Sequence, residues 1–366
     1  NQKMKKILVV DYLDIYGGAE RVLAALNKYY DFHKCYTLIN VMQKGDLRKV
    51  FANKHVEITE SNLKYLGSAF RYLFFLFPYF ISKFSLDDEK LLIISSSFSV
   101  AKGFKKKKNQ LHICYIQARN QRYIWDNQNI YFKKWQKFFL SPLIKVLQNI
   151  DIKQSKRPDY LIANSFFVKQ WIEKTYNINS NVIYPPVDTS LFKLQRKKKE
   201  YFITTARLEP YKRVDLLIKA FNKTNDILYV VGNGSLKKKL QKISNENIMF
   251  FDFLEPREVM QLVSKAKAFL HAGIEDFGIA PVEAQCCGTP VIAYNKGGVA
   301  ETVIDGKTGI LFNFQSASAI LDAINRFKEI KFNYKYISTH AAKFSEENFS
   351  KNLKKFIDSK IKEFNK

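Results

Sequence analysis

The sequence has few residues that could crosslink it or hold a metal ion. Its four cysteines, Cys35, Cys114, Cys286 and Cys287, are scattered or adjacent, which gives neither a disulfide framework nor a metal-ligand spacing. Such cysteine usage is typical of a reducing compartment. The N-terminal run KKILVVD predicts a strand and not a cleavable signal.

The sequence also lacks an apolar run long enough to span a bilayer. Its most hydrophobic segment, residues 62–84, has an uninterrupted apolar core only from 72 to 77, and this core ends at Pro78. As a helix, residues 64–83 would place Phe and Leu side chains beside basic ones, as in helices that lie on anionic lipid. A core helix of the first domain is the alternative, and the net charge favours the lipid surface.

Acidic residues are in short supply. The chain has 60 Lys and Arg against 34 Asp and Glu, a formal charge of +26, which favours partners that carry phosphate. Nucleic acid is one such partner, but no nucleic-acid reading module is present and the charge is spread along the chain. We therefore expect nucleotides or an anionic membrane surface as partners, and no nucleic acid.

The pattern of apolar runs predicts an α/β protein with two domains, as the length of 366 residues also suggests. Strand candidates alternate with helical patterns, which is typical of parallel sheets with crossover helices. We place a linker near residues 185–199, where two prolines precede a charge run, and a helix in the tail from 345 to 366. The expected strands are 6–11, 35–40, 55–59, 91–97, 112–117, 160–165, 181–185, 201–206, 227–232, 247–253, 268–273, 290–294 and 309–312.

The segment HAGIEDFGIAPVEAQC places two glutamates, Glu275 and Glu283, around a predicted turn between a strand and a helix. A helix N-terminus presents N–H groups and a partial positive charge, so Gly278 and Ile279 are expected to bring backbone donors to a pyrophosphate. Glu275 would then face the reacting end of the ligand. Glu283, about one turn inside the helix, would accept hydrogen bonds from ribose hydroxyls.

Three further loops are predicted at the same sheet edge. Arg207 follows a strand and Lys212 comes five residues later, so both cations could clamp a diphosphate. Gly232 and Gly234 follow the next strand, and Phe253 belongs to a segment that could form the wall of a base pocket. Each loop alone has an ordinary structural explanation, but their coincidence on one edge predicts a ligand site.

The first strand leads into a turn with Gly17 and Gly18, which open a helix and would let the backbone approach a ligand. The turn is not the GxGxxG fingerprint of dinucleotide-binding folds. This difference argues against a nicotinamide-dependent enzyme.

In this order, the motifs resemble the nucleotide-sugar-dependent glycosyltransferases of family 4, in the branch that includes mannosyltransferases of bacterial surface polysaccharides. The motifs are YGGAERV, ISSSFSVAKG, RYIWD, ANSFFVKQWI, YPPVDTSLF, ARLEPYKRVD, the pair of glutamates and GGVAETVIDGKTGILF. The resemblance implies the GT-B fold, with two Rossmann-like parallel-sheet domains facing each other across a cleft. The acceptor-side domain would be 1–187, the nucleotide-sugar-binding domain 188–344, and the helix 345–366 would pack back toward the first domain.

The resemblance also implies roles for the motif residues. Arg207 and Lys212 would stabilise the charge on the leaving nucleotide in place of a metal ion, and Glu275 would lie by the donor sugar. Gln117 stands where this branch usually has a histidine near the sugar, and Phe98 replaces a second one. We expect Gln117 to alter the preference for the donor sugar, and neutral drift is the alternative.

The expected function is a retaining, metal-independent hexosyltransferase without a cofactor. It would move a sugar from a GDP-mannose-like donor to a hydroxyl of a glycan or lipid-linked acceptor in surface polysaccharide biosynthesis. The expected location is the cytoplasm or the inner face of the cytoplasmic membrane. The alternatives are a UDP- or dTDP-sugar donor, including a 6-deoxy sugar, a sugar-nucleotide epimerase, an inactive scaffold and a basic nucleic-acid-binding protein.

Overall fold

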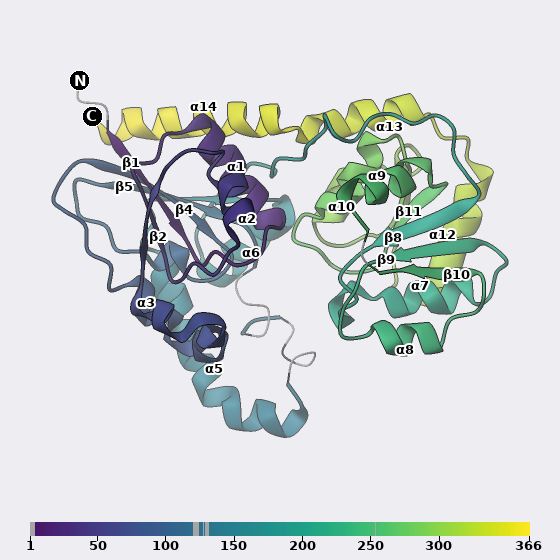
Figure 1. Ribbon diagram of the computed structural model, residues 1–366, viewed down its shortest axis with the longest axis horizontal. Helices are drawn as coiled ribbons and strands as arrows, with labels where there is room; N and C mark the ends of the chain where they lie inside the picture. Colours follow the sequence, from purple (N-terminus) through teal and green to yellow (C-terminus); the bar gives the residue numbers. More distant parts are fainter. Residues whose placement is uncertain (1–3, 120–123, 127, 129–131, 253) are drawn as a thin grey trace. The chain divides into compact units, whose positions relative to one another are not determined.

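The computed structural model describes residues 4–119, 124–126, 128, 132–252 and 254–366. These residues divide into two units, each with one parallel sheet (Figure 1). Unit 1 comprises Asn1–Pro186 together with Phe349–Lys366, and unit 2 comprises Val187–Asn348.

The sheet of unit 1 has strand order β3-β2-β1-β4-β5-β6-β7, and every neighbouring pair is parallel. Its central strands β4 and β5 are buried along their length because helices cover both faces, which explains why they contain no charged residue apart from a buried histidine. The strands are β1 (Lys5–Val10), β2 (Lys34–Thr37), β3 (Glu57–Glu60), β4 (Leu91–Ser97), β5 (Leu111–Ile116), β6 (Tyr160–Ala163) and β7 (Asn181–Val182).

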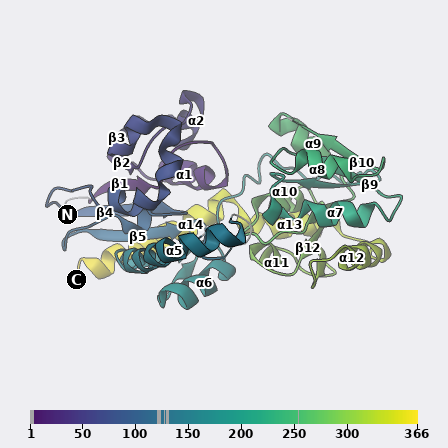
Figure 2. The same ribbon diagram turned by 90° about the horizontal axis from the view of Figure 1, so that it is seen from below.

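The helices of unit 1 include one from the far end of the chain. Phe349, Leu353 and Ile357 of that helix are buried in the same cluster as Leu8 and Tyr115 of the sheet. Figures 1 and 2 show it lying along unit 1. The helices are α1 (Gly18–Tyr29), α2 (Lys44–Val50), α3 (Phe77–Ile81), α5 (Lys134–Ser155), α6 (Phe166–Tyr176) and α14 (Glu346–Phe364), with the 3-10 segments η1 (Asn62–Leu76) and η2 (Ala101–Gly103).

The sheet of unit 2 has order β10-β9-β8-β11-β12-β13 and is also parallel throughout. Consequently, the loops after β9, β8, β11 and β12 emerge side by side at one edge, where open α/β sheets bind ligands. The strands are β8 (Tyr201–Thr205), β9 (Ile227–Val231), β10 (Ile248–Phe251), β11 (Ala268–His271), β12 (Val291–Tyr294) and β13 (Gly309–Phe312).

Two apolar clusters, one on each face, hold the helices of unit 2 on its sheet. The helix α7 is typical, because most of its eight residues are apolar and buried. The helices are α7 (Val214–Phe221), α8 (Lys237–Lys242), α9 (Pro256–Lys265), α10 (Ile279–Cys286), α11 (Gly298–Thr302), α12 (Ala317–Glu329) and α13 (Tyr334–Ala341), with the 3-10 turns η3 (Pro210–Lys212) and η4 (Ala342–Phe344).

The segment 64–83 does not form the single interfacial helix that its composition predicts. Gly67 has a φ of 51°, which interrupts the 3-10 turns of η1, and α3 is only five residues long. Phe70 and Phe77 are buried against the sheet, so part of the segment belongs to the core. In the described part of the chain, no helix is both long and apolar enough to cross a membrane.

Candidate functional site

The loop after β8 carries two of the predicted cations. Arg207 comes two residues after the strand, and Lys212 is the last residue of η3. Glu209 fixes this loop, because its carboxylate accepts hydrogen bonds from the N–H and the hydroxyl of Ser235 at 3.0 and 2.7 Å. These bonds hold the pKa of Glu209 below its usual value. The sequence pattern alone did not identify Glu209 or Ser235.

The glycines after β9 bring their loop against the Arg207 loop. Gly232 has a φ of 138°, and a Cβ at this position would lie 2.0 Å from the carbonyl oxygen of Ala206. The N–H of Leu208 donates to the carbonyl of Asn233 at 2.8 Å, and Gly234 lies beside the same backbone. The structure thus joins Gly232 and Gly234 to the Arg207 loop, and the absence of side chains is what allows the contact.

The turn after β11 is held by backbone contacts with α11. The N–H of Gly298 donates to the carbonyl of Glu275 at 2.8 Å. A Cβ on Gly298 would lie 2.3 Å from the carbonyl oxygen of Asp276, so only glycine permits this approach. Gly278 ends the turn with a φ of 90°, and α10 begins at Ile279. This is the predicted succession of strand, turn and helix.

Lys212 and Glu275 form an ion pair that joins the β8 loop to the β11 loop. Their side chains are 17% and 13% exposed, so the pair is shielded from most solvent. A lysine ammonium has three N–H donors, and the bond to Glu275 orients the group without using all of them. The structure therefore brings together two residues that the sequence placed only on the same sheet edge.

His271, the last residue of β11, lies directly behind this pair. Its Nε2 is 4.0 Å from Oε1 of Glu275 and has no hydrogen-bond partner among the described residues. The pKa of His271 is lowered to about 4, mainly by burial; the charge of Glu275 opposes this shift and that of Lys212 adds to it. The imidazole is consequently neutral at pH 7. No sequence pattern singles out His271.

The remaining predicted residues of unit 2 lie on or near α10, with one exception. Glu283 is the fifth residue of α10 and is half-buried, and Ile279 contributes its N–H to the first turn of that helix. Phe253 lies outside the residues that the structure describes.

The predicted residues of unit 1 meet at the carboxyl edge of its own sheet. Gly17 precedes α1, which begins at Gly18. Gln117 follows β5, and its Nε2 donates to Oγ of Ser96 at 2.8 Å and to the carbonyl of Ala19 at 3.3 Å. The side-chain amide of Gln117 therefore ties the first turn of α1 to β4.

Asp11 is a structural anchor of this edge that the sequence patterns did not identify. Its buried carboxylate accepts hydrogen bonds from the four consecutive N–H groups of residues 98–101. Burial raises the pKa of Asp11, although the bonds from Phe98, Val100 and Ala101 and the charge of Lys102 oppose the change. Phe98, held by one of the bonds, packs its ring edge-on against Tyr12 at 5.0 Å.

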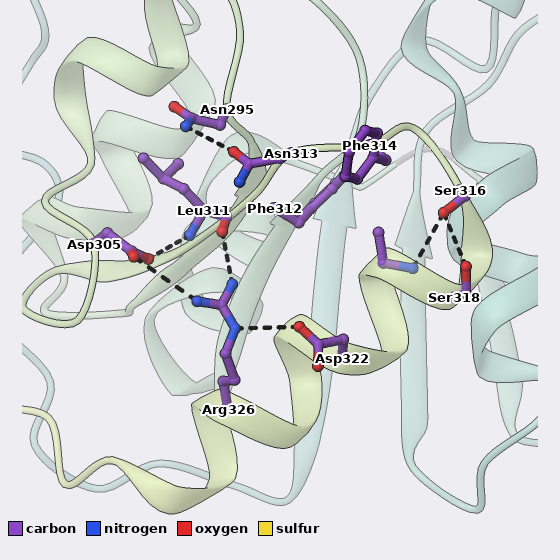
Figure 3. A pocket seen from close by; sticks show the side chains of 11 residues that line it. Asn295, Asp305, Leu311, Phe312, Asn313, Phe314, Ser316, Ser318, Asp322 and Arg326 are labelled. Atoms are coloured by element: carbon purple, nitrogen blue, oxygen red, sulfur yellow. Dashed lines mark hydrogen bonds and ion pairs between the residues drawn. The ribbon is translucent and has the colours of Figure 1, made fainter.

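A cavity of about 780 Å³ lies elsewhere on unit 2, beside β13 and α12. Figure 3 shows Arg326 reaching from α12 toward Asp305 and Asp322, with Asn295 and Asn313 at the strand ends. None of the sequence-predicted site residues lines this cavity. Among the residues that the structure describes, no group of three or more His, Cys, Asp or Glu side chains could hold a metal ion.

Comparison with known proteins identifies unit 2. The pattern of the family described as "Glycosyl transferases group 1" matches residues 187–348, the bounds of this unit. Residues 187–348 belong to the group 1 glycosyltransferases. The Lys212–Glu275 pair and the glycine loops all lie in this glycosyltransferase domain.

Two relatives of this chain are named as mannosyltransferases. The chain is 28% identical over 201 residues to the O-antigen chain mannosyltransferase RfbU of Salmonella typhimurium, covering 50% of this chain and 57% of that protein. It is 31% identical over 140 residues to a GDP-mannose-dependent alpha-(1-6)-phosphatidylinositol monomannoside mannosyltransferase of Mycolicibacterium smegmatis, covering 33% and 37%. The chain thus spans about half the length, or less, of the curated relatives it matches.

The fold is similar to that of solved glycosyltransferases over almost the whole chain. The apo form of the lipopolysaccharide outer core galactosyltransferase WaaB superposes with a TM-score of 0.69 at 20% identity, covering 98% of this chain and 100% of that one. This likeness confirms the predicted GT-B fold class, in which each unit is a Rossmann-like parallel sheet.

Proposed function

We propose that this chain is a retaining, metal-independent glycosyltransferase that moves a hexose from a nucleotide-sugar donor to a hydroxyl of a glycan or lipid-linked acceptor. The observation that carries the proposal is the Lys212–Glu275 ion pair, which lies inside a group 1 glycosyltransferase domain. It stands at a sheet edge to which Arg207 and the Gly232 loop also belong. GDP-mannose is the favoured donor, because two relatives are named as mannosyltransferases.

In the proposed reaction, the bond between the sugar carbon C1 and the donor phosphate breaks, and a bond from C1 to the acceptor oxygen forms on the same face. The proton of the acceptor hydroxyl passes to the departing phosphate oxygen, so no protein nucleophile is required. Negative charge gathers on the leaving diphosphate, where Arg207 and Lys212 would stabilise it. Glu275 keeps the ammonium of Lys212 in place before the donor arrives.

The donor would be held by backbone and carboxylate groups of the same unit. The N–H of Ile279 opens α10 and Gly278 precedes it, so a phosphate at this helix end would meet donors and the positive end of the helix dipole. Glu283, one turn farther along α10, would accept hydrogen bonds from the ribose hydroxyls.

Ligand-induced stabilisation and transfer assays test the proposal. Thermal unfolding is followed with GDP, GDP-mannose, UDP-glucose, dTDP and ADP-glucose, because a ligand that binds only the native state raises the melting temperature. Product formation from the stabilising donor is then measured with and without EDTA. We expect a GDP-mannose shift, a product that keeps the anomeric configuration, and equal rates with the chelator. No shift with any of these ligands would overturn the donor assignment, and loss of transfer in EDTA would overturn metal independence.

The identity of the sugar has a specific alternative. Gln117 cannot become cationic, unlike the histidine usual in the resembling branch, and its amide nitrogen is already bonded to Ser96 and Ala19. The GT-B fold itself does not select mannose, since the similar structure is named as a galactosyltransferase. A UDP- or dTDP-hexose, including a 6-deoxy sugar, is therefore the second candidate donor.

The location also remains part of the proposal. A lipid-linked acceptor would place the enzyme on the cytoplasmic face of a membrane, and the charge of +26 is suited to an anionic surface. We propose no nucleic-acid partner and no cofactor.

A further inference from the structure

The first turns of α5 expose three large aromatic side chains. Trp135, Phe138 and Phe139 are 61%, 77% and 73% exposed. The rings of Phe138 and Phe139 meet edge-on at 5.6 Å, and no core cluster of the described residues includes them. In Figure 1 this end of α5 extends beyond the neighbouring elements of unit 1.

The exposed side chains lie on a single face of α5. Positions 135, 138, 139, 142 and 146 follow the spacing i, i+3, i+4, i+7 and i+11, which is one stripe of an α-helix. Val146 at the end of the stripe is 53% exposed. We refer to these five residues as the α5 stripe.

The core contact of α5 uses a different face. Ile144 and Leu147 are buried, and they pack with Leu140 and with Phe74 of η1. The helix is therefore already attached to unit 1 without the α5 stripe. Packing inside the unit does not explain why the outer stripe is apolar.

The charged residues of the α5 segment have one sign. Residues 132–150 contain Lys133, Lys134, Lys137 and Lys145, and neither Asp nor Glu occurs among them. Lys133, Lys134 and Lys145 are exposed. An apolar stripe flanked by lysines is typical of a helix that lies in the headgroup region of an anionic bilayer.

Neighbouring η1 also exposes aromatic side chains. Phe74 packs against α5, and the adjacent Tyr72 and Phe75 are 82% and 38% exposed. Aromatic rings are favoured at the boundary between headgroups and acyl chains. Exposed aromatic rings of unit 1 are therefore not confined to α5, but the α5 stripe is the one that four lysines accompany.

We propose that the α5 stripe is a membrane-docking surface, with Trp135, Phe138 and Phe139 inserted among lipid headgroups and the flanking lysines beside lipid phosphates. Charge complementarity selects this occupant. A second copy of the chain would bring the lysines of both copies together, and a nucleic acid would leave the Phe rings without an apolar environment. The inference extends the proposed function, because a lipid-linked acceptor would be held in the same surface.

Vesicle co-flotation of the full chain tests the surface. Vesicles of phosphatidylcholine with phosphatidylglycerol are compared with phosphatidylcholine alone at an ionic strength of about 0.15 M, where distant charges are screened. The stripe variant is W135S/F138S/F139S, and the matched control is Phe314→Ser, since Phe314 of unit 2 is 74% exposed. We expect binding to the anionic vesicles, a loss of at least about tenfold in the stripe variant, and wild-type binding in the control.

The charged flank is tested separately with K133Q/K134Q/K145Q. This variant is expected to bind anionic vesicles more weakly and with less dependence on salt, because fewer charges are screened. Far-UV circular dichroism checks that each variant is folded, and sedimentation checks its oligomeric state.

Three outcomes overturn the docking surface. The wild-type protein does not float with anionic vesicles, or the stripe variant floats like the wild type. In the third, sedimentation shows that the wild type is a dimer and that the stripe variant is a monomer. Donor-induced thermal shifts, measured without vesicles, report on the proposed function independently. A stripe variant that loses vesicle binding but keeps the donor shift supports both inferences, whereas an absent donor shift with intact vesicle binding affects the proposed function alone.

Discussion

Lys212 and Glu275 are 63 positions apart in the sequence, and their ion pair orients two charged candidates of the described site toward each other. Breaking such a partly buried pair has different consequences from its two ends. Removing the lysine deletes the cation that would meet the diphosphate. Removing the glutamate keeps the cation but no longer holds it in a fixed orientation.

Lys212→Ala is expected to lower kcat about 10²–10³-fold, because one charge that stabilises the leaving group is lost. Glu275→Gln should reduce kcat less than Lys212→Ala, since the amide can still accept a hydrogen bond from the ammonium. Steady-state kinetics with the identified donor measures both. The control is Lys238→Ala on the exposed side of α8, which should keep the kcat of the wild type. A Lys212→Ala variant with the same kcat as this control would contradict the role of Lys212 in stabilising the leaving group.

His271 predicts a dependence of stability on acid pH. Its pKa is about 4 in the folded protein and near 6.5 when unfolded, so the unfolded chain binds more protons between these values. The stability that comes from keeping His271 neutral is fully present above pH 6.5 and is lost as the pH falls toward 4, by at most about 1.4 kcal/mol per pH unit. The free energy of unfolding of unit 2 is measured by denaturant unfolding followed by circular dichroism at several pH values. Between pH 6.5 and 4 it should fall less steeply in His271→Gln than in the wild type.

The matched control for that prediction is His33→Gln, because His33 is exposed. The free energy of unfolding of this control should fall with acid pH as steeply as that of the wild type. An unchanged slope in His271→Gln would mean that His271 is not kept neutral by the fold.

Gln117→His separates a role in donor choice from a role in holding α1. If Gln117 selects the sugar, the variant should change the ratio of kcat/KM between GDP-mannose and competing donors while the melting temperature changes little. If its bonds to Ser96 and Ala19 matter only for structure, stability should fall with the donor ratio unchanged. Kinetics on a donor panel, together with thermal unfolding, distinguishes the two.

At the scale of the element, the contact of Gly232 with the β8 loop predicts that no side chain is tolerated at position 232. Gly232→Ala combines a positive φ with a Cβ 2.0 Å from the backbone of Ala206, so the Arg207 loop must move. Gly306 also has a positive φ, 73°, but nothing lies within 4 Å of a Cβ placed there. Gly306→Ala should cost only the backbone strain, about 1–2 kcal/mol.

We expect Gly232→Ala to destabilise unit 2 more than Gly306→Ala and also to reduce the donor-induced thermal shift. Thermal unfolding with and without donor measures both effects. Equal destabilisation by the two substitutions would show that the contact with Ala206 is unimportant.

The order of elements was predictable from sequence, because aliphatic runs and turn glycines depend on local rules. Each expected strand has a counterpart in the two sheets, and Gly17 and Gly278 stand at helix starts as predicted. The connections among loops were not predictable. Asp11 accepts bonds from residues 87 to 90 positions away, and no local pattern encodes such a partner.

The sequence was also insufficient to predict which apolar helix faces are buried and which are exposed. The segment 64–83 is more hydrophobic than α5, so composition favoured it as the lipid contact. Its Phe70 and Phe77 are in fact buried, whereas Phe138 and Phe139 are exposed. An apolar stripe has the same period in both cases, and only the fold decides what it faces.

At the scale of the whole molecule, α14 predicts that the end of the described chain stabilises unit 1. Leu353 is 2% exposed within the core of that unit. Leu353→Ala should lower the free energy of unfolding of unit 1 by about 2–5 kcal/mol. The protein has three tryptophans, Trp125, Trp135 and Trp171, all in unit 1, so their fluorescence follows this unit alone.

The control substitution is Lys351→Ala on the exposed side of α14, which should leave the fluorescence transition unchanged. Circular dichroism, which reports on both units, should show the transition of unit 2 unaffected by Leu353→Ala. Fluorescence of Leu353→Ala that coincides with the wild type would contradict the contribution of α14 to the core.

The position of α14 also bears on synthesis at the ribosome. Unit 2 is one continuous stretch of chain, so it can finish folding as soon as its last residues emerge. Unit 1 is translated first but receives Phe349, Leu353 and Ile357 only after all of unit 2 has been made. The N-terminal unit must therefore wait with an uncovered apolar patch while its neighbour is completed, and this interval is when a nascent chain would most need a chaperone.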